Sequence, residues 1–308
     1  MRLLAIAPPR FGPLELLQRE APDVEIVVGT DATSLSESMG AADAILVAPR
    51  FGSVLSEIWG QIPNVRWIHT LAAGVEFLPF DLLRRTEVVV TNSRGLYADS
   101  LGEFAIAAML WFAKDLRRLM RNQEEARWEP YIVERLEGRT VGVIGFGGIG
   151  QAVGRRASAL GMNILSLRRR QEFGDPTIEE VIADSDYLVI SAPLTPATHR
   201  LVSSERLAKL KRTAVVINLS RGAIIDEEAL VACLRANRIR GAALDVFETE
   251  PLPRDHPFWK MDHVLISPHT ADQTEDSHMR AMQFFLENLA RFERGDSLEN
   301  VVDKDEQY

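Results

Sequence analysis

Three residues in the second half of the chain have side chains suited to hydride chemistry on a ketoacid. Arg221, Glu250 and His269 each follow a predicted strand, and ligands bind at the carboxyl ends of strands in open parallel α/β sheets. An arginine can hold a carboxylate and polarise a ketone, and a histidine can exchange a proton near neutral pH. A nearby glutamate orients the histidine and favours its protonated form. Taken singly, each residue also has a structural explanation, as a loop cation, a turn residue before Pro251 and a packed loop histidine.

A glycine-rich turn predicts a dinucleotide site. Gly145, Gly147 and Gly150 have G-x-G-x-x-G spacing, with Gly148 and Ile149 inside the motif. The motif follows an apolar strand and precedes a helix predicted over 151–160. In this context the glycines permit a tight turn, backbone approach to a pyrophosphate and close helix–strand packing. Backbone N–H groups at the helix start would then hold the phosphates.

The strand after this motif ends in three arginines instead of an acidic residue. An acid there would bind the ribose hydroxyls of adenosine and repel a 2′-phosphate, whereas guanidinium groups can bind that phosphate. We therefore predict that NADP(H) is preferred, with NAD(H) as the alternative cofactor. The competing interpretation is a solvated basic turn. The arginines are Arg168, Arg169 and Arg170.

Composition narrows the class of protein. The chain has 308 residues, a formal charge of −9, and 46% hydrophobic and 26% charged residues, as in a folded protein of about two domains. The acidic balance argues against a nucleic-acid partner. The lone cysteine, Cys233, excludes a disulfide framework, and no histidine pair has metal-ligand spacing, so no metal is expected. The short apolar N-terminal run predicts a strand and not a signal peptide, and no apolar stretch is long enough for a membrane span. We expect a cytoplasmic location.

Apolar runs alternate with helical patterns, which indicates an α/β protein with two Rossmann-like, doubly wound parallel sheets. One long helix is expected over 99–120, and the tail from about 274 is again helical, returning to pack on the first domain. The strands predicted in the first series are Leu3–Ala7, Glu25–Val28, Ala44–Val47, Trp67–His69 and Val88–Thr91. Those in the second series are Val141–Ile144, Asn163–Leu167, Tyr187–Ile190, Val215–Asn218, Gly241–Leu244 and Val264–Ile266.

Over nearly its whole length the chain resembles the D-isomer-specific 2-hydroxyacid dehydrogenases, of the glyoxylate and hydroxypyruvate reductase type. The resemblance rests on eight ordered segments, one of which is the glycine-rich turn. The segments are Leu71–Val75, Ala98–Glu103, Gly145–Gly150, Ala192–Thr198, Asn218–Asp226, Ala243–Pro253, Ser267–Thr270 and Asn300–Asp303.

The resemblance implies a role for each matching residue. Arg221 would bind the substrate carboxylate and carbonyl, His269 would be the acid/base, and Glu250 its partner. Ala73 and Gly74 would receive the substrate carboxylate through backbone N–H groups. The resemblance also implies a homodimer, with much of the interface formed by the helix after residue 98. The other implied cofactor contacts are Ala192, Pro193, Leu219, Asp245 (near the nicotinamide carboxamide) and Ala271.

We expect a substrate domain from residues 1–98 and 274–308 and a cofactor domain from 99–273. Their cleft would hold the active site, where a hydride passes reversibly between the cofactor and a small 2-ketoacid or D-2-hydroxyacid. Two departures from the family pattern are Asp272, near the nicotinamide edge, and Glu76 in the first-domain loop. His69 and Arg50 have both a substrate-contact and a structural interpretation.

Other functions share parts of this pattern. Transcriptional corepressors built on the same fold sense dinucleotides and retain the Arg–Glu–His set, but they generally carry added tails. Formate oxidation is found in a branch of the resembling family that has glutamine at this position, so Glu250 argues against that activity. A phosphoglycerate dehydrogenase without its regulatory domain is a further alternative. The substrate itself cannot be identified from the sequence, because every 2-ketoacid shares the carboxylate–ketone unit.

Overall fold

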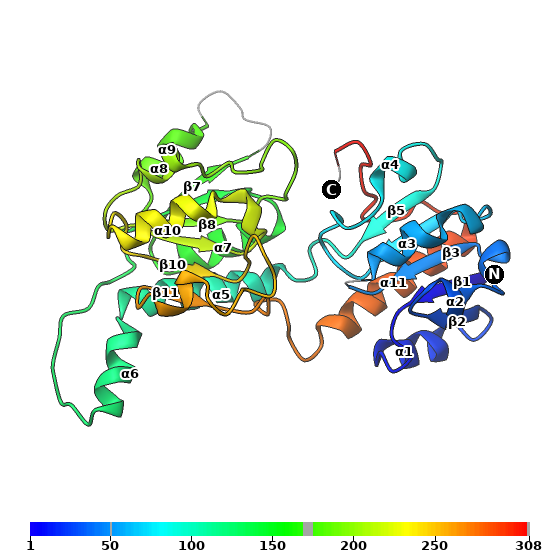
Figure 1. The fold of residues 1–308 in the computed structure, drawn as a ribbon, viewed down its shortest axis with the longest axis horizontal. Coiled ribbons are helices and arrows are strands. Elements are labelled where there is room, and N and C mark those ends of the chain that lie inside the picture. The colour runs from blue at the N-terminus through cyan, green and yellow to red at the C-terminus, as the bar shows by residue number, and fades with distance from the viewer. Residues whose placement is uncertain (50, 169–174, 307–308) are drawn as a thin grey trace. The chain divides into compact units, whose positions relative to one another are not determined.

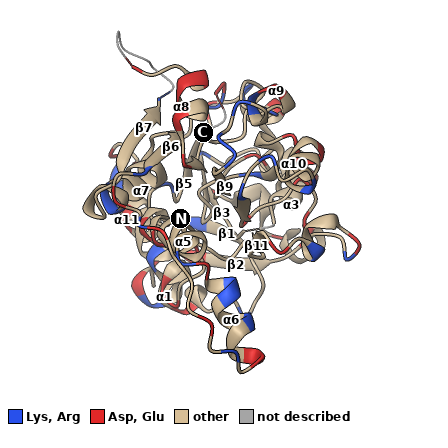
Figure 2. Cartoon of the chain, turned by 90° about the vertical axis from the view of Figure 1, so that its left-hand side faces the viewer, with Lys and Arg blue, Asp and Glu red and all other residues tan. Residues whose placement is uncertain are grey.

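The computed structural model describes residues 1–49, 51–168 and 175–306, which form two compact units (Figure 1). Unit 1 comprises Met1–Leu96 and Thr274–Tyr308, and unit 2 comprises Tyr97–Gln273. The first boundary, at 96/97, lies two residues before the expected 98/99, and the second falls at the expected 273/274. Residues of both charges occur along both units (Figure 2). In the described part of the chain no helix is long and apolar enough to cross a membrane.

Unit 1 is built on a five-stranded parallel sheet in the order β2-β1-β3-β4-β5. The strands are β1 (Arg2–Ile6), β2 (Glu25–Gly29), β3 (Ala44–Val47), β4 (Trp67–Thr70) and β5 (Val89–Asn92). The helices are α1 (Pro13–Glu20), α2 (Ala32–Leu35), α3 (Gly52–Ile58), α4 (Phe80–Leu83) and α11 (Ser277–Arg294), with short 3₁₀ turns at Met39–Ala41 and Trp59–Gln61. Every residue of β3 and β4 is buried, as expected for strands covered on both faces.

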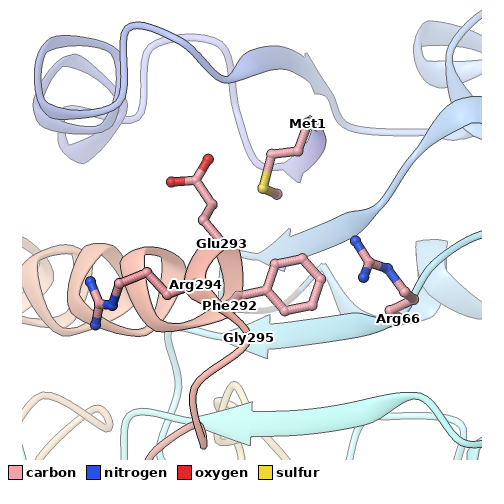
Figure 3. A pocket seen from close by; sticks show the side chains of 6 residues that line it. All are labelled: Met1, Arg66, Phe292, Glu293, Arg294 and Gly295. Atoms are coloured by element: carbon pink, nitrogen blue, oxygen red, sulfur yellow. The ribbon is translucent and has the colours of Figure 1, made fainter.

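Helix α11 belongs to unit 1 although it lies at the end of the sequence. The buried Phe285 ring stacks on the Trp67 ring of β4, with centroids 5.1 Å apart. The ring centroids of Phe292 and Trp67 are 5.2 Å apart. The Arg66 guanidinium lies over the Phe292 ring, 4.8 Å from its centroid (Figure 3). Arg66 and Phe292 border a hollow of about 460 Å³ near the amino ends of β1 and β4, at the edge of the sheet opposite its carboxyl ends.

Unit 2 is built on a six-stranded parallel sheet in the order β11-β10-β9-β8-β6-β7. The strands are β6 (Thr140–Ile144), β7 (Asn163–Leu167), β8 (Tyr187–Ile190), β9 (Val215–Asn218), β10 (Gly241–Leu244) and β11 (Val264–Ile266). The helices are α5 (Ala98–Ala113), α6 (Leu116–Glu124), α7 (Gly148–Ala159), α8 (Ile178–Asp184), α9 (Ser204–Leu207) and α10 (Glu227–Arg235), with 3₁₀ turns at Gly222–Ile224 and Pro257–Lys260. The predicted fold class of two parallel α/β sheets is confirmed.

The expectation of one helix over 99–120 is wrong, because α5 ends at Ala113 and α6 begins at Leu116. Asp115 adopts a left-handed backbone with φ 48°, and its carboxylate accepts the Arg118 N–H at the start of α6. Lys114 Nζ donates to the carbonyl of Glu134 at 2.6 Å, which holds the corner in place. The apolar periodicity continues across the corner, so it could not reveal the break.

His69, on β4, lies in the core of unit 1. Its side chain is fully buried, with Nδ1 2.7 Å from Thr91 Oγ1 and Nε2 3.4 Å from Ser93 Oγ. The ring also packs against Phe284 and Phe285. Burial lowers the pKa of His69 to about 3, because the charged form would lose its hydration. These contacts favour the structural interpretation of this residue.

We predict that His69 makes the stability of the protein fall on the acid side of pH 6.5. The native imidazole stays neutral, whereas the unfolded chain takes up a proton below its ordinary pKa of 6.5, so stability is present above that pH and is lost towards pH 3. Between pH 7 and 5 the loss is about 2 kcal/mol from this residue. Urea unfolding at both pH values measures the free energy of unfolding. Its decrease from pH 7 to pH 5 should be about 2 kcal/mol smaller in His69→Gln than in the wild-type protein. An equal drop in the two proteins would contradict the prediction.

Candidate active site

Arg221, Glu250 and His269 lie in the loops that follow β9, β10 and β11, three neighbouring strands of sheet order β11-β10-β9. Parallel strands end at the same edge of a sheet, so these three loops are adjacent in space. The structure thus brings together the side chains that the sequence placed at separate strand ends.

His269 and Glu250 form a direct hydrogen bond. The distance from His269 Nδ1 to Glu250 Oε2 is 2.7 Å, and the other carboxylate oxygen, Oε1, accepts the backbone N–H of Phe247 at 3.0 Å. The side chains are 33% and 32% exposed. The pair is therefore held in one orientation while remaining accessible to a small molecule.

The hydrogen bond changes the acidity of both groups. The bond to Glu250 raises the pKa of His269, and the negative charges of Glu250 and Asp245 add to the effect, which exceeds the opposing effects of burial and of the Arg221 charge. Burial by itself would raise the pKa of Glu250, but the hydrogen bonds from His269 and Phe247 and the charges of His269 and Arg221 together lower it. The arrangement favours a protonated imidazole beside an ionised carboxylate.

Gly222 allows the Arg221 loop to reach the Glu250 loop. A Cβ at this position would stand 1.9 Å from the Phe247 carbonyl carbon and 2.2 Å from Glu248 N, so only glycine permits the two backbones to approach this closely. The Asn218 amide donates to the carbonyl of Arg221 at 2.9 Å and fixes the same loop from the end of β9. The Arg221 charge contributes to lowering the pKa of Glu250 and opposes the rise in the pKa of His269.

Asp245, at the end of β10, holds the loop that carries His269. Its Oδ1 accepts hydrogen bonds from Ser267 Oγ at 2.6 Å and from the backbone N–H groups of Thr270 at 2.9 Å and Ala271 at 3.1 Å. Its backbone carbonyl accepts the N–H of His269 at 2.8 Å. These bonds maintain His269 in a left-handed backbone conformation, φ 56°, that a residue with a side chain rarely adopts.

The glycine-rich turn has room for a dinucleotide phosphate. Gly145 has φ 94°, and a Cβ there would stand 2.4 Å from Ala192 N, so the turn passes close to the loop after β8. Around Gly147 there is open space within 4 Å of the Cβ position, and no side chain caps the start of α7. Gly148, Ile149 and Gly150 form its first turn. Free backbone N–H groups at a helix start fit a pyrophosphate.

The other predicted cofactor contacts follow β8, β9 and β11 of the same sheet. Ala192 and Leu219 are buried at the ends of β8 and β9, where the Ser220 hydroxyl donates to the Ala192 carbonyl. Pro193 is exposed. The Ala271 carbonyl accepts the Ser100 hydroxyl of α5 at 2.5 Å.

Arg168 follows β7, with its guanidinium 5.3 Å above the Phe146 ring in a cation–π contact. Arg169 and Arg170, and likewise Arg50, lie outside the described residues. Sequence reasoning did not single out Phe146 as part of this region. It also missed Asn218 and Thr270 as positioning groups, although both lie inside segments that it quoted.

Ala73 and Gly74 belong to unit 1, in the loop after β4. Asn92 Nδ2 donates to the Ala73 carbonyl at 2.6 Å, and Ser93 N donates to the Ala72 carbonyl at 3.0 Å, so the end of β5 fixes this loop. Among the described residues, no group of three or more His, Cys, Asp or Glu side chains is arranged to hold a metal ion.

Comparison with known proteins gives consistent matches. Residues 106–271 match the family described as D-isomer specific 2-hydroxyacid dehydrogenase, NAD binding domain. A glyoxylate reductase of Korarchaeum cryptofilum is 32% identical over 306 residues, 95% of this chain and 90% of that protein. A D-3-phosphoglycerate dehydrogenase of Methanocaldococcus jannaschii is 30% identical over 98% of this chain but only 59% of its own length. A D-isomer specific 2-hydroxyacid dehydrogenase of Xanthobacter autotrophicus, solved with NADPH and MES, has TM-score 0.84 and 30% identity over 100% of this chain and 99% of that one.

We predict that Glu250→Gln lowers the pKa of His269. An uncharged amide removes the charge-assisted bond and the favourable field, so the imidazole loses its proton at lower pH. An NMR titration of the ring protons measures the change, and Glu228→Gln, on α10, is the control for loss of one carboxylate elsewhere. An unaltered His269 titration in Glu250→Gln would remove Glu250 from this role.

Proposed function

The chain belongs to the D-isomer specific 2-hydroxyacid dehydrogenase family, and from this premise we propose that it reduces a short 2-ketoacid such as glyoxylate or hydroxypyruvate, reversibly and with NADPH preferred over NADH. The observation that carries the proposal is the 2.7 Å bond between His269 and Glu250 beside Arg221, at the carboxyl edge of the sheet that bears the glycine-rich turn. An imidazole whose protonated form is favoured, together with a guanidinium, suits a ketone that becomes an alkoxide.

Each residue has a defined task in this proposal. Arg221 binds the substrate carboxylate and stabilises the negative charge that develops on the ketone oxygen. His269 gives its proton to that oxygen, and Glu250 keeps the imidazole oriented and protonated until then. Ala73 and Gly74 of unit 1 donate backbone N–H groups to the carboxylate. In the reverse direction neutral His269 accepts the hydroxyl proton.

The residues that would hold the dinucleotide are those around the glycine-rich turn. The first turn of α7, from Gly148, would bind the pyrophosphate, and Ala192, Leu219 and Asp245 would line the nicotinamide side. When bound, the reduced nicotinamide supplies the hydride that adds to C2 of the ketoacid. The hydrogen bonds between Asp245 and the loop around His269 would keep the imidazole in place during proton transfer.

We predict that His269→Ala and Arg221→Ala each lower kcat/KM for the best 2-ketoacid by about 100-fold or more, since a general acid or an oxyanion-stabilising group contributes at least that much. The panel to assay contains glyoxylate, hydroxypyruvate, longer 2-ketoacids and a phosphorylated one, each with NADPH and NADH. His199→Ala and Arg212→Ala, at exposed positions of the same unit, are the matched controls. Turnover near the wild-type value in either test variant would contradict the assignment.

The arginines after β7 support the cofactor preference. A charge-assisted hydrogen bond to the 2′-phosphate contributes about 10- to 150-fold in binding. We predict that kcat/KM is at least about tenfold higher with NADPH than with NADH, by the same reckoning. Arg168→Asp should abolish or reverse the preference, because a carboxylate repels the phosphate and can bind ribose hydroxyls. Equal kcat/KM for both cofactors at low salt would refute the preference.

We further propose that the protein forms a homodimer through α6 and the segment after it. Large apolar side chains on this part of the chain face solvent, and Trp128 and Ile132 are 96% and 99% exposed. The segment is anchored at its far end, where Glu134 N donates to the Ala113 carbonyl at 2.9 Å. An exposed apolar segment that is anchored to the rest of the unit is typical of a protein interface. The other exposed large apolar residues in α6 and the segment after it are Leu119, Met120 and Val133.

We predict that the double variant Trp128→Ser and Ile132→Ser weakens the dimer at least about 100-fold. Burial of each large apolar side chain contributes about 1.5–3 kcal/mol, and a factor of ten in Kd corresponds to about 1.4 kcal/mol. Sedimentation equilibrium measures the constant. Trp259→Ser, half-exposed elsewhere in unit 2, is the control, and a monomeric wild-type protein would refute the dimer.

A further inference from the structure

Unit 2 carries a hollow of about 470 Å³ lined by Phe146, Gln151, Arg155 and Arg168. Two guanidinium groups line it, and none of the described residues that line it is acidic. The lining comes from three places in the sequence: the glycine-rich turn, helix α7 and the end of β7. Two positive charges directed at one hollow in a chain of charge −9 favour an anionic ligand there.

Local packing sets the shape of this hollow. The Phe146 ring rests on α7 at Gly154, where a Cβ would stand only 3.2 Å from its Cε2 and Cζ atoms. On that ring lies the Arg168 guanidinium, and Gln151 Nε2 donates to the Phe146 carbonyl at 3.3 Å. Gln151 and Arg155 are four residues apart on α7 and therefore share one side of the helix. Arg155 thus approaches from the helix while Arg168 approaches from the strand.

The Arg155 guanidinium shares its carboxylate partner with a neighbour. Its Nη2 atom is 3.3 Å from Asp99 Oδ1, and the same oxygen lies 3.1 Å from Nη2 of Arg156. Arg156 is the more buried of the two, and it also contacts Glu103 and the Ala152 carbonyl. An exposed ion pair at 3.3 Å contributes little stability, so Arg155 can turn to a ligand at small cost.

We propose that Arg155 is a specificity-determining residue that binds the adenosine 2′-phosphate of NADPH together with Arg168. This inference rests on the proposed use of NADPH and adds a residue to it. A phosphate monoester carries nearly two negative charges and several acceptor oxygens, so it is best matched by more than one guanidinium. Arg156, the next residue of the same helix, bonds to the same Asp99 but does not line the hollow.

The test measures binding of adenosine 2′,5′-bisphosphate and of ADP by isothermal titration calorimetry, in the full chain at low salt. These probes carry no nicotinamide, so the readout is independent of turnover. Arg155→Gln should raise the Kd of the 2′,5′-bisphosphate about tenfold or more and leave that of ADP within about twofold. Arg156→Gln, the matched control, should change neither Kd. Thermal unfolding of both variants checks that the fold is retained.

The outcomes separate this inference from the proposed cofactor preference. If the wild-type protein binds both probes equally, the proposed NADPH preference fails and the role of Arg155 fails with it. If the wild-type protein prefers the 2′-phosphate but Arg155→Gln behaves like Arg156→Gln, the preference stands and Arg155 has no part in it. If Arg155→Gln weakens both probes alike, Arg155 contacts a part that they share, and the 2′-phosphate assignment is overturned.

Discussion

The buried carboxylate of Asp245 is the interaction on which the rest of the candidate site depends. A carboxylate that is 1% exposed must be paired or hydrogen-bonded, and here a single oxygen accepts three donors from the 267–271 loop. Those bonds compensate the unusual backbone of His269 and point its Nδ1 at Glu250. Without these bonds nothing would offset the cost of the left-handed backbone at His269, and its imidazole would lose its orientation.

A second constraint is the close approach of backbones at the carboxyl edge of the unit 2 sheet. Gly222 brings the loop after β9 against the loop after β10, and Gly145 brings the phosphate turn against the loop after β8. Hydroxyl groups then join these loops, as in the 2.7 Å bond from Ser191 Oγ to the Gly145 carbonyl. The segments proposed for catalysis and for cofactor binding are in this way joined along one edge of the sheet, as a reaction between two bound molecules requires.

Charge is distributed unevenly around this edge. The chain is acidic as a whole, yet the charge of Arg221 acts on His269 and Glu250, and Arg155 and Arg168 line the hollow beside α7. Each basic group is near a position where the proposed ligands carry negative charge: the substrate carboxylate and the 2′-phosphate. An overall negative charge with local positive sites keeps polyanions away while small anions can still bind.

The sequence alone determined the periodic elements, because hydrophobic alternation and glycine placement are local signals. The predicted bounds of β8, β9 and β10 agree with the structure, and the Arg–Glu–His set follows from strand ends that must share an edge. Only the tertiary structure decided the contacts between residues far apart in the chain. They include the burial of His69, the hydrogen bonds between Asp245 and the His269 loop and the stacking of Phe285 on Trp67. The placement of Arg155 and Arg168 in the lining of one hollow, with Phe146, belongs with them. The break at Asp115 also escaped prediction, since its cause includes a bond from Lys114 to Glu134, twenty residues away. Patterns of single residues report which face is buried, but partners are chosen by how separate segments pack, and no local period encodes that choice.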